Sequence, residues 1–121
     1  MSKSSTTTKR ALKESRRAMT TEVVDGMPPI HPGEILLEDV IKPLGMTAHG
    51  FARALRVPAT RMSEIVHGRR AVTADTALRL SRYLGATAQF WLNLQAAYDL
   101  KTAEAESGPA IAREVRPRDA A

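Results

Sequence analysis

The chain has 121 residues, no cysteine and a formal net charge of +5 at pH 7; 43% of its residues are hydrophobic, but only 4% are aromatic. This composition predicts one domain, favours packed helices over an aromatic-rich β-sandwich, and excludes disulfide frameworks, thiol nucleophiles and cysteine-based zinc sites. Because the sequence has neither the roughly 18 consecutive apolar residues of a membrane-spanning helix nor the pattern of a signal peptide in residues 1–27, we expect a cytoplasmic protein with no membrane partner.

The two ends of the chain differ in composition from its middle. Residues 1–27 are rich in Ser, Thr, Lys and Arg and contain few large apolar side chains, which predicts a flexible basic arm. Residues 107–121 contain Gly108 and Pro109 and are predicted to form a disordered tail. The folded domain is therefore expected over residues 28–106, where the apolar residues recur at helical spacing.

The first predicted helix begins near Pro32, because proline suits the first position of a helix. It ends between Lys42 and Gly45, since Pro43 lacks an N–H donor and Gly45 accepts a positive φ. Its apolar residues follow the i, i+3, i+4, i+7 spacing of one helical face and are Leu37, Val40, Ile41 and Leu44. This face is expected to point into the core.

A second and a third helix are predicted next, separated by only a few residues. Thr47 is a suitable N-cap for the second helix, which runs to about Leu55. Pro58 begins the third helix, which runs to about His67, and Gly68 ends it. The residues expected to face inward are Phe51, Ala52 and Leu55 in the second helix and Met62, Ile65 and Val66 in the third.

Two more helices complete the predicted all-α domain of five helices. The fourth covers residues 74–84, with Thr73 as its N-cap and Gly85 as its stop. The fifth follows Thr87 and covers residues 88 to about 104. The inward residues of the fourth helix are predicted to be Ala77, Leu80 and Leu84.

The fifth predicted helix is apolar on more than one side, so it needs more than one surface to cover it. We expect it to pack on its own domain and also on a second copy of the chain. Its large side chains fit either core positions or a dimer interface. The residues assigned to contact within a homodimer are Phe90, Trp91, Leu94 and Tyr98.

The second and third helices, followed at once by Gly-Arg-Arg, have the layout of a helix-turn-helix, in which one helix lies in the major groove of DNA. If the third helix buries its apolar stripe, its polar residues face outward. Arg61 could then donate two hydrogen bonds to a guanine, Thr60 could contact a thymine methyl, and Glu64 could accept from cytosine. Ser63 could bond to more than one base.

Groups that suit phosphates flank this face. Arg69 and Arg70 come directly after the third helix, and the backbone amides near Thr47 and Ala48 begin the second. Double-stranded DNA is therefore the partner that the residues favour.

The order and spacing of four motifs in this region resemble a known family. The motifs are HPGEIL, SEIVHGRR, TADTALRLSRYLG and FWLNLQAAYDL. Over about residues 27–101 the chain resembles the antitoxins of the HigA type, also called VapI-like addiction-module antidotes, which are similar to the lambda-repressor or XRE class of helix-turn-helix domains. The resemblance implies a homodimer that binds an inverted repeat of operator DNA, represses its own operon and neutralises a RelE-like, mRNA-cleaving toxin of the HigB type.

The resemblance also assigns site residues by position. The positions that face the groove in this class fall on Ala59, Thr60, Arg61, Ser63 and Glu64, and the backbone contacts fall on Thr47, Ala48, His67 and Arg70. The chain departs from many relatives at Ala48, where glutamine is common, and at Ala59, where a long polar residue is common. Because alanine offers no side-chain hydrogen bond, base readout is expected to shift to Thr60 and Arg61.

The residues fit an enzyme or a metal-binding protein less well than a DNA-binding protein. An enzyme is disfavoured because no HExxH, GxSxG, phosphate-binding glycine loop or pair of catalytic carboxylates is present. Glu64 and His67 have the spacing of two metal ligands, but a metal site needs three or four, so no metal or other cofactor is predicted. Glu34, Glu38 and Asp39 form either a solvated acidic face or a surface for a basic toxin.

Two alternatives stay open at this stage. The helix-turn-helix chemistry is common to antitoxins and to stand-alone XRE-type repressors that have no toxin partner. The basic arm could be a start-site artefact, a contact with the DNA backbone, or a segment that folds on the toxin.

Overall fold

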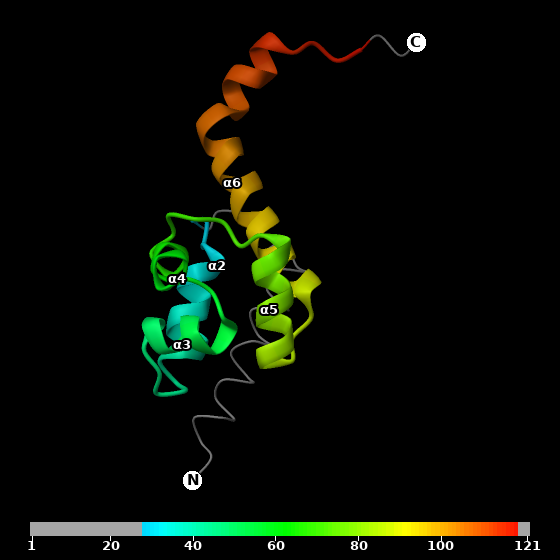
Figure 1. Cartoon of the computed structure of the whole chain (residues 1–121). Helices are drawn as coiled ribbons and strands as arrows, with labels where there is room; N and C mark the ends of the chain where they lie inside the picture. Colours follow the sequence, from blue (N-terminus) through cyan, green and yellow to red (C-terminus); the bar gives the residue numbers. More distant parts are fainter. Residues whose placement is uncertain (1–27, 119–121) are drawn as a thin grey trace.

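The computed structural model describes residues 28–118, so the predicted arm of residues 1–27 lies outside it (Figure 1). All the secondary-structure elements assigned within residues 28–118 are helices, which confirms the all-α prediction. In chain order the elements are α2 (Pro32–Leu36), the π-helix η2 (Leu37–Ile41), α3 (Ala48–Leu55), α4 (Ala59–Val66), α5 (Ala74–Leu84) and α6 (Ala88–Glu114).

The first predicted helix forms in two parts. α2 begins at Pro32 as predicted and continues without a break into η2, where the Lys42 N–H donates to the Leu37 carbonyl at 3.0 Å. A π-type turn holds one more residue than an α-helical turn. Residues beyond it are therefore rotated away from the apolar face. Leu44, predicted to be inward, lies in the turn after η2 and is 43% exposed.

Threonine begins three of the helices, as predicted. The side-chain oxygens of Thr47, Thr73 and Thr87 accept hydrogen bonds from backbone N–H groups three residues ahead, at 2.9, 3.4 and 3.1 Å. Each bond satisfies a donor that the first turn of a helix leaves without an intrahelical partner. The starts of α3, α5 and α6 are therefore set locally by the sequence.

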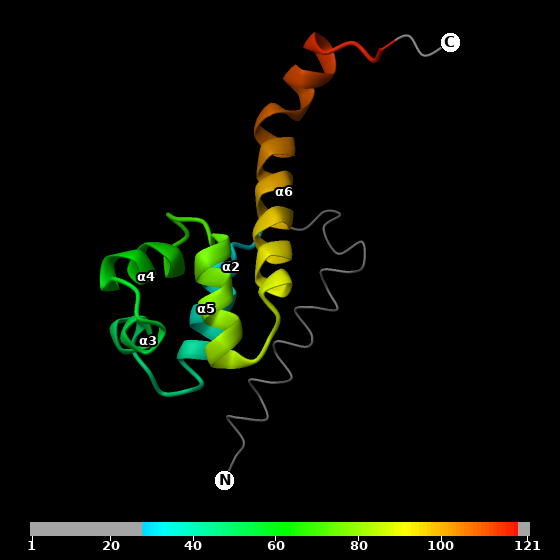
Figure 2. The ribbon, with the colours of Figure 1, turned by 45° about the vertical axis from the view of Figure 1, so that its right-hand side comes forward.

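One hydrophobic core joins all the helices. Figure 2 shows α3 and α4 on one side of the molecule, with α2 and α5 between them and α6. The inward stripes predicted for α3 and α4 are buried, and α5 buries Ala77 and Leu80 but leaves Leu84 half-buried. The largest fully buried side chains include Trp91, Phe51, Leu36, Ile41 and Met62.

The last helix is longer than predicted. α6 continues past the predicted end near residue 104, runs through Pro109 and ends at Glu114. The predicted disordered tail is corrected here, because residues 107–114 are helical. Pro109 removes one helical donor, but it is exposed, so the carbonyl left without that donor can bond to water. Alanines on both sides of Pro109 favour the helix.

Candidate nucleic-acid interface

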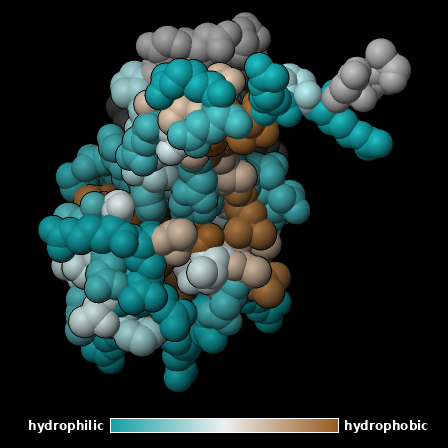
Figure 3. All heavy atoms as spheres, turned by 90° about the horizontal axis from the view of Figure 1, so that it is seen from above, coloured by the Kyte–Doolittle hydropathy of each residue, from teal (hydrophilic) through white to brown (hydrophobic). Residues whose placement is uncertain are grey.

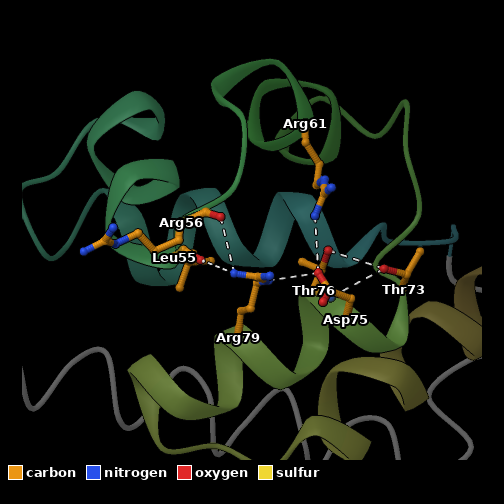
Figure 4. A network of polar contacts seen from close by, with 7 residues as sticks. All are labelled: Leu55, Arg56, Arg61, Thr73, Asp75, Thr76 and Arg79. Atoms are coloured by element: carbon orange, nitrogen blue, oxygen red, sulfur yellow. Dashed lines mark hydrogen bonds and ion pairs between the residues drawn. The ribbon is translucent and has the colours of Figure 1, made fainter.

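Hydrogen bonds from α5 stabilise the turn between α3 and α4. Arg56 ends α3 in the left-handed conformation, with φ of 60°. The Arg79 guanidinium of α5 donates to the Leu55 carbonyl at 3.1 Å and to the Arg56 carbonyl at 3.3 Å (Figure 4). The helix-turn-helix layout predicted from the sequence is present. Arg79 was not predicted to support it, although its i, i+4 spacing from Asp75 was an available signal.

The outer face of α4 is polar, as a helix that lies in a DNA groove requires. Its predicted readers fall into two groups by exposure. The exposed group is Thr60 and Ser63, and the half-buried group is Ala59, Arg61 and Glu64. Thr60 and Ser63 therefore present their hydroxyls freely, while the longer side chains have partners within the chain.

Arg61 reaches across to α5 rather than straight outward. Its Nη1 lies 3.4 Å from Oδ2 of Asp75, and its side chain is 33% exposed (Figure 4). The same Asp75 oxygen accepts a shorter bond, 2.9 Å, from Nε of Arg79. That bond, followed by the charges of Arg79 and Arg61, lowers the pKa of Asp75. Asp75 thus links Arg61, a predicted base reader on α4, to Arg79, which binds the turn.

Glu64 and Arg70, predicted as a base reader and a phosphate contact, bind each other. Nε of Arg70 donates to Oε1 of Glu64 at 2.7 Å, and both side chains are about half exposed. This bond holds the Arg70 guanidinium against the end of α4. To contact a phosphate, Arg70 must share or leave Glu64, so the ion pair restrains the basic edge of the interface.

The loop after α4 turns sharply and exposes its cations. Gly68 adopts φ of 74°, and the Arg69 N–H donates to the Glu64 carbonyl at 2.8 Å. Nδ1 of His67 donates to the Ser63 carbonyl at 2.7 Å, which leaves Nε2 of this exposed ring facing outward from the end of α4. Arg69 and His67 therefore lie at the exposed end of α4.

At the other end of the face, α3 begins with Thr47. Its Oγ1 is occupied by the Gly50 N–H, so the group that Thr47 and Ala48 offer a phosphate is the backbone amide. Thr47 is exposed and Ala48 is half-buried. These two residues and the 67–70 loop flank α4, which is the arrangement predicted for backbone contacts.

No family model matches this chain. It is 62% identical over 78 residues to virulence-associated protein I of Dichelobacter nodosus, an alignment that covers 64% of this chain and 72% of that protein. Its structure matches that of a HigA-family addiction-module antidote protein from Coxiella burnetii with a TM-score of 0.71 and 50% identity, over 75% of this chain and 99% of that one. The chain belongs to the HigA family.

A HigA structure that is similar to this chain includes nucleic acid. It is that of the Pseudomonas aeruginosa antitoxin HigA with its higBA promoter, which matches this chain with a TM-score of 0.72 and 44% identity, over 74% of this chain and 98% of that one. At that coverage the likeness includes the greater part of the described residues.

The HPGEIL motif places α4 in this HigA-family chain. Nδ1 of His31 accepts the Gly33 N–H at 2.9 Å and caps α2. Gly33 lies so close to the end of α4 that a Cβ there would collide with the Ile65 carbonyl. Burial lowers the pKa of His31, against the opposing influence of Asp99 and of a hydrogen bond to the Arg70 backbone. The motif is therefore a support for the interface rather than a part of it.

A buried glutamine on α6 anchors the loop between α4 and α5. Oε1 of Gln95 accepts the Val72 N–H at 2.8 Å, and Nε2 donates to Asp99 at 2.9 Å. Because Val72 lies two residues after Arg70, this bond fixes the path of the loop that carries Arg69 and Arg70 away from the end of α4. Sequence reasoning missed Gln95, since a polar residue in a mostly apolar helix reads equally well as a surface position.

The predicted dimer contacts on α6 need correction. Phe90, Trp91 and Leu94 are buried within the single chain, with at most 5% of each residue exposed, so they have no surface left for a partner. Tyr98 is half-buried, and its ring packs edge-on against His31 with the centroids 4.9 Å apart. The first three are core residues, because α2 and α5 already cover the apolar sides of this part of α6.

The described surface offers few other kinds of site. Among residues 28–118 no three His, Asp or Glu side chains are grouped to hold a metal ion. None of the helices in that range combines the length and hydropathy needed to cross a membrane. Seen from above, the molecule is mostly hydrophilic, with hydrophobic side chains gathered in a narrow band (Figure 3).

Proposed function

We propose that this HigA-family chain is an antitoxin that binds operator DNA, represses its own operon and neutralises a RelE-like toxin. The observation that carries the DNA-binding part is the polar face of α4, which follows a tight turn and is flanked by amides at one end and by exposed cations at the other. The toxin-neutralising part rests on membership of the family. The chain acts in the cytoplasm, as a binding protein rather than an enzyme and without a cofactor.

The proposed roles follow from the side-chain geometry. Thr60, Ser63 and Arg61 read base edges, and Ala59 lies against the groove without a hydrogen bond. Glu64 reads cytosine or, through its bond of 2.7 Å, positions Arg70. The proposed contacts to the DNA backbone are Thr47, Ala48, His67, Arg69 and Arg70.

The proposed DNA-binding unit is a homodimer on an inverted repeat. Each copy inserts one α4, and two copies related by a two-fold axis read half-sites about 10 base pairs apart, centre to centre, or a multiple of that distance. The operator should therefore show dyad symmetry.

Coexpression tests the antitoxin function. The small open reading frame beside this gene is expressed alone and together with the full chain, while growth is followed and any complex is isolated. Growth arrest that the chain relieves, with a stable complex, supports the proposal. Absence of toxicity, or toxicity without relief, leaves the stand-alone repressor as the better account.

Footprinting on the promoter of the gene tests the DNA-binding function separately. Protection of a dyad-symmetric sequence is expected. Equal affinity for the promoter and for unrelated DNA of the same length would contradict operator recognition.

A further inference from the structure

Two buried polar side chains from other elements bond to the loop of residues 67–73, which leads from α4 to α5. Three polar side chains are buried in the part of the chain that the structure describes: His31, Thr76 and Gln95. Thr76 belongs to the first turn of α5 and bonds to the N-cap of that helix. The other two come from the start of α2 and from α6. Burial of a polar group is costly unless its hydrogen bonds are made, so their shared choice of partner calls for a reason.

The second half of this loop depends on bonds from outside it. The N–H groups of Gly68 and Arg69 donate to the carbonyls of Ile65 and Glu64 at 2.9 and 2.8 Å, which ties the first half of the loop to the end of α4. Among the described residues, no backbone–backbone hydrogen bond involves residues 70–72. Side chains from other elements therefore set the path of the backbone there.

His31 contacts the loop from the start of α2. A Cβ on Gly68 would lie 3.8 Å from Cβ and Cγ of His31, so the loop backbone packs on this side chain. The His31 ring also forms a hydrogen bond with the Arg70 backbone. Because Nδ1 accepts the Gly33 N–H at 2.9 Å, Nε2 is the nitrogen that donates to the Arg70 carbonyl. Burial lowers the pKa of His31, which favours the neutral ring that both bonds require.

Gln95 holds the loop two residues further on, from α6. Its Oε1 accepts the Val72 N–H at 2.8 Å. Its Nε2 donates to Oδ1 of Asp99 at 2.9 Å, so both ends of the side-chain amide are bonded and its orientation is fixed. The backbone is thus held on its inner side at Arg70 and at Val72, one from each of two elements.

We infer that His31 and Gln95 are positioning residues for the contact of this chain with DNA phosphates, because they fix the backbone from which Arg69 and Arg70 project. Both arginines are exposed, whereas His31 and Gln95 are 7% and 6% exposed and act only through the loop. An arginine on a fixed backbone loses less conformational freedom when it binds a phosphate than one on a loose backbone. The inference rests on the proposed function and deepens it.

Fluorescence anisotropy of the full chain with promoter DNA and with scrambled DNA, over a range of salt concentrations, tests the role of His31. His31→Asn keeps an acceptor in the place of Nδ1 but has no donor in the place of Nε2. It should bind both DNAs about threefold to tenfold more weakly, with a smaller salt slope. His31→Gln has a donor in the place of Nε2 and gives up the cap of α2. It should recover most of the lost affinity.

The role of Gln95 is tested in the same assay. Gln95→Met keeps the length of the side chain but leaves the Val72 N–H without its acceptor, so it should lose affinity for both DNAs as His31→Asn does. Gln89→Met is the matched control. Gln89 also lies on α6 and bonds to a side chain four residues ahead at 2.9 Å, but it is exposed and outside the loop contacts, so this variant should bind like the wild type. Circular dichroism and urea unfolding show whether each variant is folded under the binding conditions.

A background in which Arg69 and Arg70 are both replaced by alanine separates positioning from a general weakening of the fold. His31→Asn and Gln95→Met should cause no further loss of DNA affinity there, because the side chains that they position are absent. The same loss in this background as in the wild type would overturn the inference. Wild-type affinity of His31→Asn and Gln95→Met, or a loss confined to promoter DNA, would also overturn it.

The wild type distinguishes this inference from the proposed function. If it binds the promoter and the anchor variants bind equally well, the inference fails and operator binding stands. If it binds both DNAs equally, operator recognition fails, and the phosphate contact is still measured by the variants. If it binds neither DNA, the proposed function fails and the inference fails with it.

Discussion

At the residue scale, the two arginines of the interface have partners that predict different roles. Arg61 belongs to the outer face of α4, whereas Arg70 lies beyond its end and is held by Glu64. Arg61→Ala should weaken operator binding by about 1–3 kcal/mol and relax the preference at one base pair. Arg70→Ala should weaken binding to all sequences and reduce the salt slope by about 0.9.

Fluorescence anisotropy with operator DNA and with scrambled DNA, over a range of salt concentrations, separates these effects. Lys101→Ala is a control, because this residue lies on α6, outside the set of proposed DNA contacts. If Arg61→Ala and Arg70→Ala lose the same affinity for operator DNA and for scrambled DNA, Arg61 does not read bases.

His31 gives the stability of the fold a pH dependence of known sign. Its pKa is lowered from 6.5 by burial, so the unfolded chain takes up a proton more readily than the folded chain. The contribution of neutral His31 to the free energy of unfolding is complete above the pKa of this residue in the unfolded chain. It is lost as the pH falls below that pKa. In His31→Asn, asparagine can still cap α2 but does not titrate.

Urea unfolding at about pH 7.5 and about pH 5.5 measures this contribution. The wild type should lose more stability than His31→Asn between the two values, since all other titrating groups are shared. Parallel losses would show that His31 does not titrate differently in the folded chain.

At the element scale, the close approach of α2 to α4 fixes the position of the helix that we propose reads bases. Gly33→Ala should collide with the Ile65 carbonyl and lower the free energy of unfolding by about 2 kcal/mol or more. Gly108→Ala on α6 is the control, because the nearest atom to its new Cβ is at an ordinary 4.0 Å. Chemical denaturation that finds both variants equally stable would contradict the proposed packing.

The helices and their starts were predictable because their signals are local. Caps at Thr47, Thr73 and Thr87 and the stop at Gly85 depend on a few neighbouring residues. The π-turn in η2 and the extension of α6 were not predictable in this way. A π-turn depends on how the whole first helix fits the core. A proline inside a helix usually kinks or ends it, so the local sequence around Pro109 predicts a stop, whereas α6 continues.

The candidate site was predictable in its residue types but not in its internal bonds. Exposed Thr60 and Ser63 follow from helical periodicity once Met62 and Ile65 are assigned to the core. The pairing of Arg61 with Asp75, across 14 positions, depends on the tertiary arrangement of α4 and α5. The same limit explains why Phe90 fitted an interface as well as a core: periodicity shows that a face is covered, not what covers it.

At the scale of the whole molecule, the far half of α6 extends away from the rest of the protein (Figure 2). Every residue from 109 to 118 except Ala110 is exposed. Removing residues 107–121 should therefore change the free energy of unfolding by less than about 0.5 kcal/mol and leave operator affinity unchanged. Thermal unfolding and promoter binding of the shortened chain measure both; a large loss of stability would show that this end packs on the domain.

In the Arg61–Asp75 ion pair, the Asp75 carboxylate competes with operator DNA for the Arg61 guanidinium. A partly exposed ion pair of this kind contributes about 0–1 kcal/mol, whereas a guanine that accepts two bonds from an arginine contributes about 1–3 kcal/mol. In the proposed role of Arg61, a guanine that accepts two hydrogen bonds can displace Asp75 from this arginine, whereas a base that accepts only one weak bond cannot. If Arg61 reads a base as proposed, Asp75 sets a threshold of affinity, and Arg61 stays bound to Asp75 on sequences that nearly match the operator.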